Sequence, residues 1–81
     1  MSNNKNWKEE SGALHRSIKT DGYAEAVATV VNIAMVADKQ NHHPTMTIGY
    51  NTVDIMLTTH DQGNTITDKD RKLARAIDDI V

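Results

Sequence analysis

The sequence predicts an α+β fold, in which helices pack on one face of an antiparallel sheet. Three observations lead to this prediction. Residues 14–20 and 53–59 alternate apolar with polar side chains, as half-buried strands do. Residues 23–38 carry apolar side chains at helical spacing, and a capping signal at Thr67 opens a last helix. The expected order of elements is (short α)–β–α–β–β–α.

Composition restricts the size and class of the protein. The 81 residues make one domain, 1–81, with residues 1–6 expected to be frayed. A net charge of −2 argues against direct nucleic-acid binding, and no stretch reaches the roughly 20 apolar residues of a membrane span. The chain has no cysteine, and only 4% of its residues are aromatic. We therefore expect a cytoplasmic protein with a thin core that forms a homo-oligomer.

The N-terminal segment predicts a short helix followed by a strand. Residues 6–14 can form a helix around Trp7, whose ring we expect to plug the core, and Gly12 would end this helix. Residues 14–20 then read as a strand, placed at a sheet edge because of its charges. Asp-Gly at 21–22 indicates a turn.

The helix expected over 23–38 has more apolar surface than one contact face needs. Its predicted core stripe comprises Tyr23, Ala26, Val27, Val30, Ile33, Ala34 and Ala37. Val31, Met35 and Val36 widen the apolar surface beyond this stripe. The excess indicates a second partner, such as another subunit.

The C-terminal half predicts a hairpin and a helix. Pro44 ends the preceding helix and favours extended geometry at His43. Strands over 45–50 and 53–59 would be joined by a Tyr-Asn-Thr turn and followed by a loop over 60–66. The last helix would begin after Thr67, with Asp70 completing a capping box. Its predicted buried face consists of Leu73, Ala74, Ile77 and Ile80.

Three of the four histidines are expected to meet at one end of the sheet. His42 and His43 are adjacent in an extended segment, so their side chains point to different sides. The hairpin runs away from this pair and back, which returns His60 to its neighbourhood. Imidazoles exchange protons near neutral pH, so the cluster predicts an acid–base pocket for a small heterocyclic substrate. His15 has no other histidine near it in the predicted fold and is expected to face solvent.

Less specific interpretations exist for each of these residues. Three imidazoles can hold zinc, but the His-Glu-x-x-His pattern is absent and adjacent histidines diverge. Asp38 and Asn41 could orient an imidazole or bind a ligand edge. They could equally be a solvated helix-end charge and a C-capping residue. Asp70 already has its explanation as a capping residue.

Within residues 38–78 the chain resembles the pterin-4a-carbinolamine dehydratases, also known as a dimerization cofactor of a transcription factor. The resemblance rests on "DKQNHHP" (38–44), "YNTVDIMLTTHD" (50–61) and "TDKDRKLARAID" (67–78), and on the spacing from His43 to His60. Weaker similarity extends back to Trp7.

The resemblance implies an α+β fold, a dimer or tetramer, and dehydration of 4a-hydroxytetrahydropterin to quinonoid dihydropterin. It implies neither a metal nor an organic cofactor. His42, His43 and His60 match the histidines that line the pterin site; we assign the direct proton transfers to His42 and His60, and a supporting role to His43. By the same match, the segments expected to frame the pterin contain Pro44, Thr59, Asp61 and Gln62. Asp38 and Asn41, which come just before the histidine pair, complete the set of residues expected to bind the substrate.

The chain departs from the usual pattern of the family at several positions. The first helix is curtailed, and Ile18 and Thr20 replace common aromatics. Asp38 stands where Glu is usual, and the loop after His60 is about one residue longer. These differences affect the pocket mouth and the choice of pterin more than the proton-transfer set. An alternative function is a non-catalytic module that binds a protein partner and keeps the fold.

Overall fold

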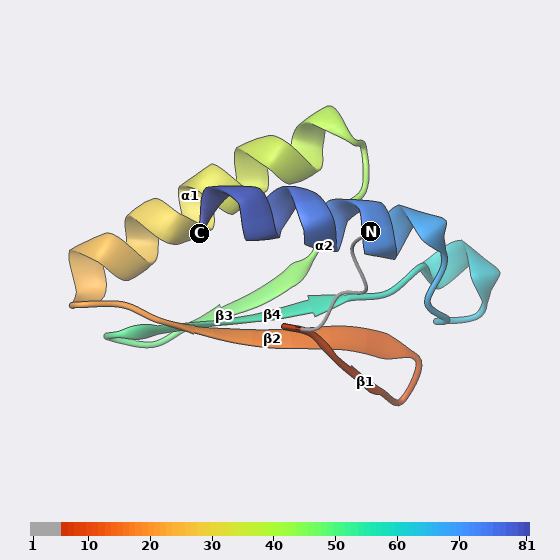
Figure 1. The fold of residues 1–81 in the computed structure, drawn as a ribbon, viewed down its shortest axis with the longest axis horizontal. Helices are drawn as coiled ribbons and strands as arrows, with labels where there is room; N and C mark the ends of the chain where they lie inside the picture. Colours follow the sequence, from red (N-terminus) through yellow and green to blue (C-terminus); the bar gives the residue numbers. More distant parts are fainter. Residues whose placement is uncertain (1–5) are drawn as a thin grey trace.

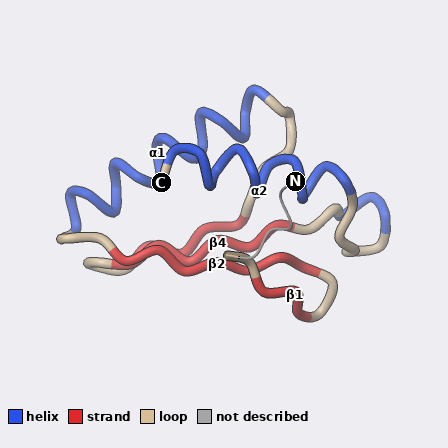
Figure 2. Tube along the Cα trace, in the orientation of Figure 1, coloured by secondary structure: helices blue, strands red, loops and turns tan. Residues whose placement is uncertain are grey.

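The computed structural model describes residues 6–81 as a single sheet covered on one face by two helices (Figures 1 and 2). The order of elements is β1 (Lys8–Glu10), β2 (Ala13–Lys19), α1 (Tyr23–Lys39), β3 (Thr45–Ile48), β4 (Thr52–Leu57), a short 3₁₀ helix (His60–Gln62) and α2 (Asp68–Ile80). The four strands are antiparallel in the order β1-β2-β4-β3. The predicted α+β class, with helices on one face, is confirmed. The prediction that residues 1–6 fray lies almost entirely outside the described residues.

The predicted N-terminal helix over 6–14 is wrong, because this segment forms β1 and a tight turn into β2. Glu10 and Ala13 are paired, and Ser11 and Gly12 between them have φ of 53° and 78°. Two successive residues with positive φ make the two-residue hairpin turn whose twist matches that of its strands. The Ser-Gly dipeptide was the sequence signal for this turn.

The strand predicted at a sheet edge is an interior strand. β2 pairs with β1 on one side and over its whole length with β4 on the other, from Leu14↔Leu57 to Lys19↔Thr52. The charges on β2 do not mark a sheet edge. Some of its polar side chains project from the face of the sheet that the helices do not cover, and others contact α2. Arg16 is one of the latter and forms an ion pair with Asp78.

The core lies between the sheet and the two helices. β4 contributes Val53, Ile55 and Leu57, and α2 contributes Leu73, Ala74 and Ile77, all of them 2% exposed or less. Trp7 is buried in the same cluster, as expected, and its indole N–H donates to Asp78 Oδ1 at 2.9 Å. The predicted buried face of α2 extends one residue too far, since Ile80 is 43% exposed.

α1 buries a narrower stripe than predicted. Ala26, Ile33 and Ala37 are buried, with Val30 packed beside them. Val36, which was expected to lie outside the core stripe, also packs against the core. The remaining predicted or adjoining apolar residues stay exposed, namely Tyr23, Val27, Val31, Ala34 and Met35. Four of these, Tyr23, Val27, Val31 and Met35, recur every four residues and therefore form one exposed stripe along the helix. Neither α1 nor α2 is long and apolar enough to cross a membrane.

The two hairpin strands end earlier than predicted. β3 stops at Ile48 rather than at residue 50, and β4 stops at Leu57 rather than at residue 59. Gly49 N–H donates to Thr52 O at 2.8 Å, so the turn begins one residue before the predicted Tyr-Asn-Thr. Because β4 ends at Leu57, Thr58 and Thr59 lie outside the strand, and both line the pocket described below.

Gly12 is the point at which the β1–β2 turn meets the loop over residues 59–65. A Cβ added to Gly12 would lie 2.3 Å from the backbone oxygen of Asn64. Gly12→Ala should therefore destabilise the protein by about 2 kcal/mol or more, from left-handed strain and from displacement of the loop. Gly63 is the matched control, because its φ is 77° but nothing lies within 4 Å of its Cβ position. Gly63→Ala should cost only about 1 kcal/mol in urea unfolding, and equal losses in the two variants would exclude the clash.

Candidate functional site

The end of α1 fixes the position of the histidine pair. Asn41 has a φ of 51°, and its N–H donates to Asp38 O at 3.0 Å. The next N–H, that of His42, donates to Ala37 O at 3.2 Å. These two bonds form a Schellman motif, in which a left-handed residue ends the helix and satisfies its last carbonyls. Asn41 is therefore a C-capping residue, and the cap places His42 at the end of the sheet where β3 begins.

The two adjacent histidines point to different sides, as the extended geometry predicts. The His42 side chain is only 12% exposed, whereas that of His43 is 63% exposed. His43 Nε2 lies 3.6 Å from Asp38 Oδ1, and both groups face solvent. An exposed pair at this distance contributes little stability, so the tightly held member is His42.

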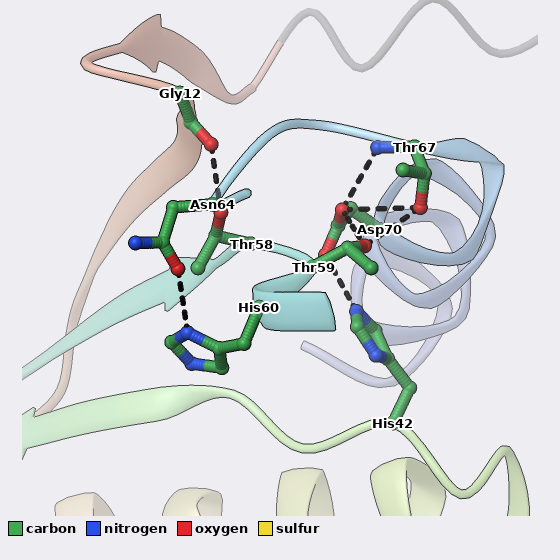
Figure 3. A network of polar contacts seen from close by, with 8 residues as sticks. All are labelled: Gly12, His42, Thr58, Thr59, His60, Asn64, Thr67 and Asp70. Carbon is green, nitrogen blue, oxygen red and sulfur yellow. Dashed lines mark hydrogen bonds and ion pairs between the residues drawn. The ribbon is translucent and has the colours of Figure 1, made fainter. Parts of the chain in front are cut away.

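Asp70 is the buried partner of His42 (Figure 3). Its carboxylate is fully buried, and Oδ1 accepts from His42 Nε2 at 2.5 Å. The other oxygen, Oδ2, accepts from Thr59 Oγ1 at 2.7 Å and from the Thr67 N–H at 2.9 Å. Thr67 and Asp70 form the predicted capping box at the start of α2. The residue expected to be only a helix cap thus also holds a histidine that is 28 positions away in the sequence.

Asp70 is ionised in this network. Burial by itself would raise the pKa of Asp70. The hydrogen bonds from His42, Thr59 and the Thr67 N–H outweigh that cost, so the pKa of this carboxyl lies below its ordinary value of 3.8. A carboxylate only accepts hydrogen bonds, so the His42 nitrogen that faces it must carry a proton. The contact engages Nε2, and Nδ1 is the other nitrogen of this ring.

His60 lies in the short 3₁₀ helix that follows β4, and Asn64 is its hydrogen-bond partner. Its Nδ1 lies 2.7 Å from Asn64 Oδ1, in an exposed position. Figure 3 shows this ring joined to Asn64 and separate from the hydrogen bonds around Asp70 that hold His42. His15 lies elsewhere, on β2, where its Nε2 is 3.3 Å from Glu10 O.

One pocket of about 500 Å³ joins the three histidines. It is lined by Asn41, His42, His43, Thr58, Thr59, His60, Asp61 and Lys69. The hairpin therefore returns residue 60 to the histidine pair, as the order of elements predicted. Within residues 6–81 no three histidine, aspartate or glutamate side chains are grouped as a metal ion would require.

The other predicted residues occupy three different locations. Asn41, Thr59 and Asp61 line the histidine pocket. Asp38 and Pro44 instead line a second, apolar hollow between α1 and β3, which shares His43 with the first. Gln62 is exposed in the 3₁₀ helix and is not among the lining residues of either hollow.

Sequence reasoning missed Lys69 and underestimated Asp70. Lys69 lines the pocket from the first turn of α2, immediately before the buried carboxylate. The only sequence signal for Lys69 was its position between Thr67 and Asp70, because a capping box fixes which way the side chains of the first helical turn point. The role of Asp70 toward His42 depends on a long-range contact that no local pattern reveals.

Comparison with known proteins agrees with this architecture. A family model described as pterin 4 alpha carbinolamine dehydratase matches residues 1–80. The chain belongs to this family. Its members are named for a dehydratase, and the site described above lies within the matched residues.

Curated relatives and a solved structure extend this result. A Streptomyces coelicolor protein, provisionally named pterin-4-alpha-carbinolamine dehydratase, is 38% identical over 74 residues, which cover 91% of this chain and 73% of the relative. A Chloroflexus aurantiacus protein with the same provisional name is 40% identical over 75 residues, covering 93% and 80%. The crystal structure of a transcriptional coactivator/pterin dehydratase from Brucella melitensis superposes with a TM-score of 0.85 at 33% identity, covering 94% and 82%.

A more distant structure shares the fold with this pterin dehydratase family. It is a pterin dehydratase-like protein identified as a RuBisCO assembly factor in the alpha-carboxysome, with a TM-score of 0.69. Its identity to this chain is 20%, and the match covers 89% of this chain and 82% of that one. The fold therefore also occurs in a protein described by an assembly role.

Proposed function

We propose that the protein dehydrates a 4a-hydroxytetrahydropterin to a quinonoid dihydropterin by histidine acid–base catalysis. One observation carries the proposal: His42, His43 and His60 line one pocket in a chain that belongs to the pterin-4a-carbinolamine dehydratase family. A hollow of about 500 Å³ is within the range of small-molecule sites.

The reaction needs one proton donor and one proton acceptor. The lone pair of the ring nitrogen beside the carbinol carbon forms a C=N bond as the C–OH bond breaks. The hydroxyl leaves as water with a proton from the acid, and the base takes the proton of the ring N–H. Proton transfer by positioned side chains contributes about 100-fold to 10,000-fold to such steps.

The partners of the two histidines favour different roles. His42 faces the ionised Asp70 at 2.5 Å, which supports the positive charge of a protonated imidazole. His60 faces the neutral amide of Asn64, which gives no such support. We therefore assign the acid to His42, acting through Nδ1, and the base to His60. His43 is the more exposed wall of the pocket and is assigned to binding.

The remaining matched residues are assigned to the surroundings of the pterin. Asn41 and Asp61 line the pocket and offer an amide and a carboxylate to the polar edge of the ring. Thr59 is nearly fully buried and acts mainly through Asp70. The contributions proposed for Asp38, Pro44 and Gln62 are to the pocket mouth, where the chain differs from the usual family pattern.

The direct test is turnover of a 4a-hydroxytetrahydropterin, followed by the absorbance of the quinonoid product. The protein should accelerate dehydration well above the rate in buffer. A stable 7,8-dihydropterin should also shift the ring NMR signals of His42 and His60 and leave those of His15 unchanged. Dehydration at the buffer rate for every 4a-hydroxypterin tested would refute the proposed activity.

A second candidate function is supported by the exposed stripe on α1. Tyr23, Val27, Val31 and Met35 are between 39% and 62% exposed, which is unusual for four aligned apolar side chains. We propose that this face binds protein, either further copies in a homodimer or homotetramer or a different partner. Light scattering at micromolar concentration should give a mass above 9.0 kDa. A monomer that captures no partner would contradict this candidate.

A cytoplasmic location belongs to the same proposal and fits a chain without cysteine.

A further inference from the structure

We propose that Asn64 is a positioning residue that fixes the tautomer and orientation of His60. This inference rests on the proposed function and deepens it, because it states which nitrogen of the base meets the substrate. Asn64 is outside the set of residues assigned above from the resemblance.

The loop that carries His60 is closed by its own backbone. The Thr59 N–H donates to Thr65 O at 3.0 Å, and the Asn64 N–H donates to Thr59 O at 3.1 Å. Gly63 and Asn64 both have left-handed φ, of 77° and 57°, which reverses the chain within two residues. The reversal brings the side chain of residue 64 back over residue 60 (Figure 3).

Asparagine at position 64 meets two requirements, a left-handed backbone and a hydrogen-bond acceptor facing His60. Asparagine tolerates left-handed φ better than other residues that have a side chain, apart from aspartate. Its amide oxygen accepts a hydrogen bond but cannot donate one. The contact of 2.7 Å between Asn64 Oδ1 and His60 Nδ1 therefore requires a proton on Nδ1. The Nε2 lone pair is then the one that accepts the substrate proton.

The rest of the fold holds Asn64 in place. The turn at Gly12 approaches the backbone oxygen of Asn64 so closely that no side chain fits between them. Thr58 Oγ1 donates to Gly12 O at 2.8 Å, which ties the same turn to the end of β4. The base is exposed, and an exposed imidazole otherwise samples several rotamers. The hydrogen bond from Asn64, whose loop is held by the Gly12 turn and by its own backbone, restricts the His60 ring to one rotamer.

The two imidazoles are thus fixed through opposite nitrogens. His42 uses Nε2 for Asp70 and leaves Nδ1, whereas His60 uses Nδ1 for Asn64 and leaves Nε2. The hydrogen bond to one ring nitrogen determines which tautomer the other nitrogen presents. A carboxylate partner suits the proton donor, and a neutral amide suits the proton acceptor.

Two variants at one position separate this role from a structural one. Asn64→Gly keeps the left-handed backbone at no steric cost and removes the acceptor. Asn64→Asp keeps an acceptor oxygen and also tolerates the backbone. Both are compared with the parent protein at pH 8, where free imidazole is mostly neutral. Two-bond ¹H–¹⁵N spectra report the tautomer of His60, and the ring of His15 serves as an internal reference.

The parent and Asn64→Asp should show His60 protonated on Nδ1, whereas Asn64→Gly should lose that preference. The kcat of Asn64→Gly should fall about 10-fold to 100-fold with KM nearly unchanged. Asn64→Asp serves as the control for the tautomer alone, because its carboxylate keeps an acceptor at Nδ1 but no longer gives the base a neutral partner. An unchanged His60 tautomer in Asn64→Gly would overturn the inference, and so would a full kcat after the tautomer has changed.

The tautomer spectrum also separates the failure of this inference from failure of the proposed function. If the parent protein shows no turnover, the proposed function fails. The spectra then decide alone whether Asn64 controls His60, because they need no substrate.

Discussion

Replacing His42 with glutamine should lower kcat for pterin dehydration about 100-fold or more. The glutamine amide can donate to Asp70 as His42 Nε2 does, so the buried carboxylate keeps a partner. The amide cannot deliver a proton to the departing hydroxyl. The loss should therefore appear in turnover, with little change in the midpoint of urea unfolding. His42→Ala should show the same loss of activity together with reduced stability.

The pH dependence of the same variants tests the division of roles. An acid must be protonated and a base must be neutral, so the parent protein should have a bell-shaped profile of kcat against pH. His42→Gln should lose the limb on the alkaline side, and His60→Gln should lose the limb on the acid side. His15→Ala, which changes a histidine outside the pocket, should keep both limbs and full turnover. Full activity in both pocket variants would exclude the acid–base mechanism.

Replacing Asp70 with alanine should destabilise the fold by about 2–4 kcal/mol. Asp70 is fully buried and accepts from His42, Thr59 and the Thr67 N–H. Its removal leaves these donors buried without their acceptor and also removes one half of the capping box of α2. The measurement is the free energy of unfolding in urea, with an unchanged slope to confirm that the same transition is compared.

Asp79→Ala is the matched control for Asp70→Ala. Asp79 is exposed near the end of the same helix, so its replacement should change stability by less than about 0.5 kcal/mol. Similar losses in the two variants would show that helix composition, not the buried network, sets the stability. Asp70→Ala should also reduce turnover, since His42 loses the partner that orients it.

Acid unfolding gives a second measure of the Asp70 network. The pKa of Asp70 is lower in the folded protein than its ordinary value of 3.8, because three hydrogen bonds outweigh the effect of burial. The unfolded state therefore binds the proton more readily, and the stabilisation is present above pH 3.8. It is lost as the pH falls through the folded-state pKa. The stability difference between the parent and Asp70→Asn should shrink over that window, and a constant difference would contradict this network.

The sequence alone predicted the elements that strong local patterns define. β4 was predicted because Val53, Ile55 and Leu57 alternate with polar residues, and α2 because Thr67 and Asp70 precede an apolar stripe. The meeting of His42 and His60 in one pocket was also predictable, because a hairpin must return the chain to its starting edge.

Local patterns were misleading where pairing partners are distant in the sequence. The charged segment Lys8–Glu10 has no strand periodicity of its own, and it becomes β1 because the Ser11–Gly12 turn folds it onto β2. β2 carries enough charge to suggest an edge, yet its neighbours on both sides place it inside the sheet. The exposed side of α1 could not be distinguished from its buried side, since both are apolar.

The types of the side chains proposed to react and their order along the chain were therefore set by the sequence, through periodicity and turn chemistry that act over a few residues. Which nitrogen of each imidazole is engaged was decided only by the tertiary structure. Asp70 reaches His42 across 28 positions, and Asn64 reaches His60 through a loop held against Gly12. Hydrogen bonds of this kind depend on the relative placement of separate elements, and that placement follows from how the sheet and helices pack around the core.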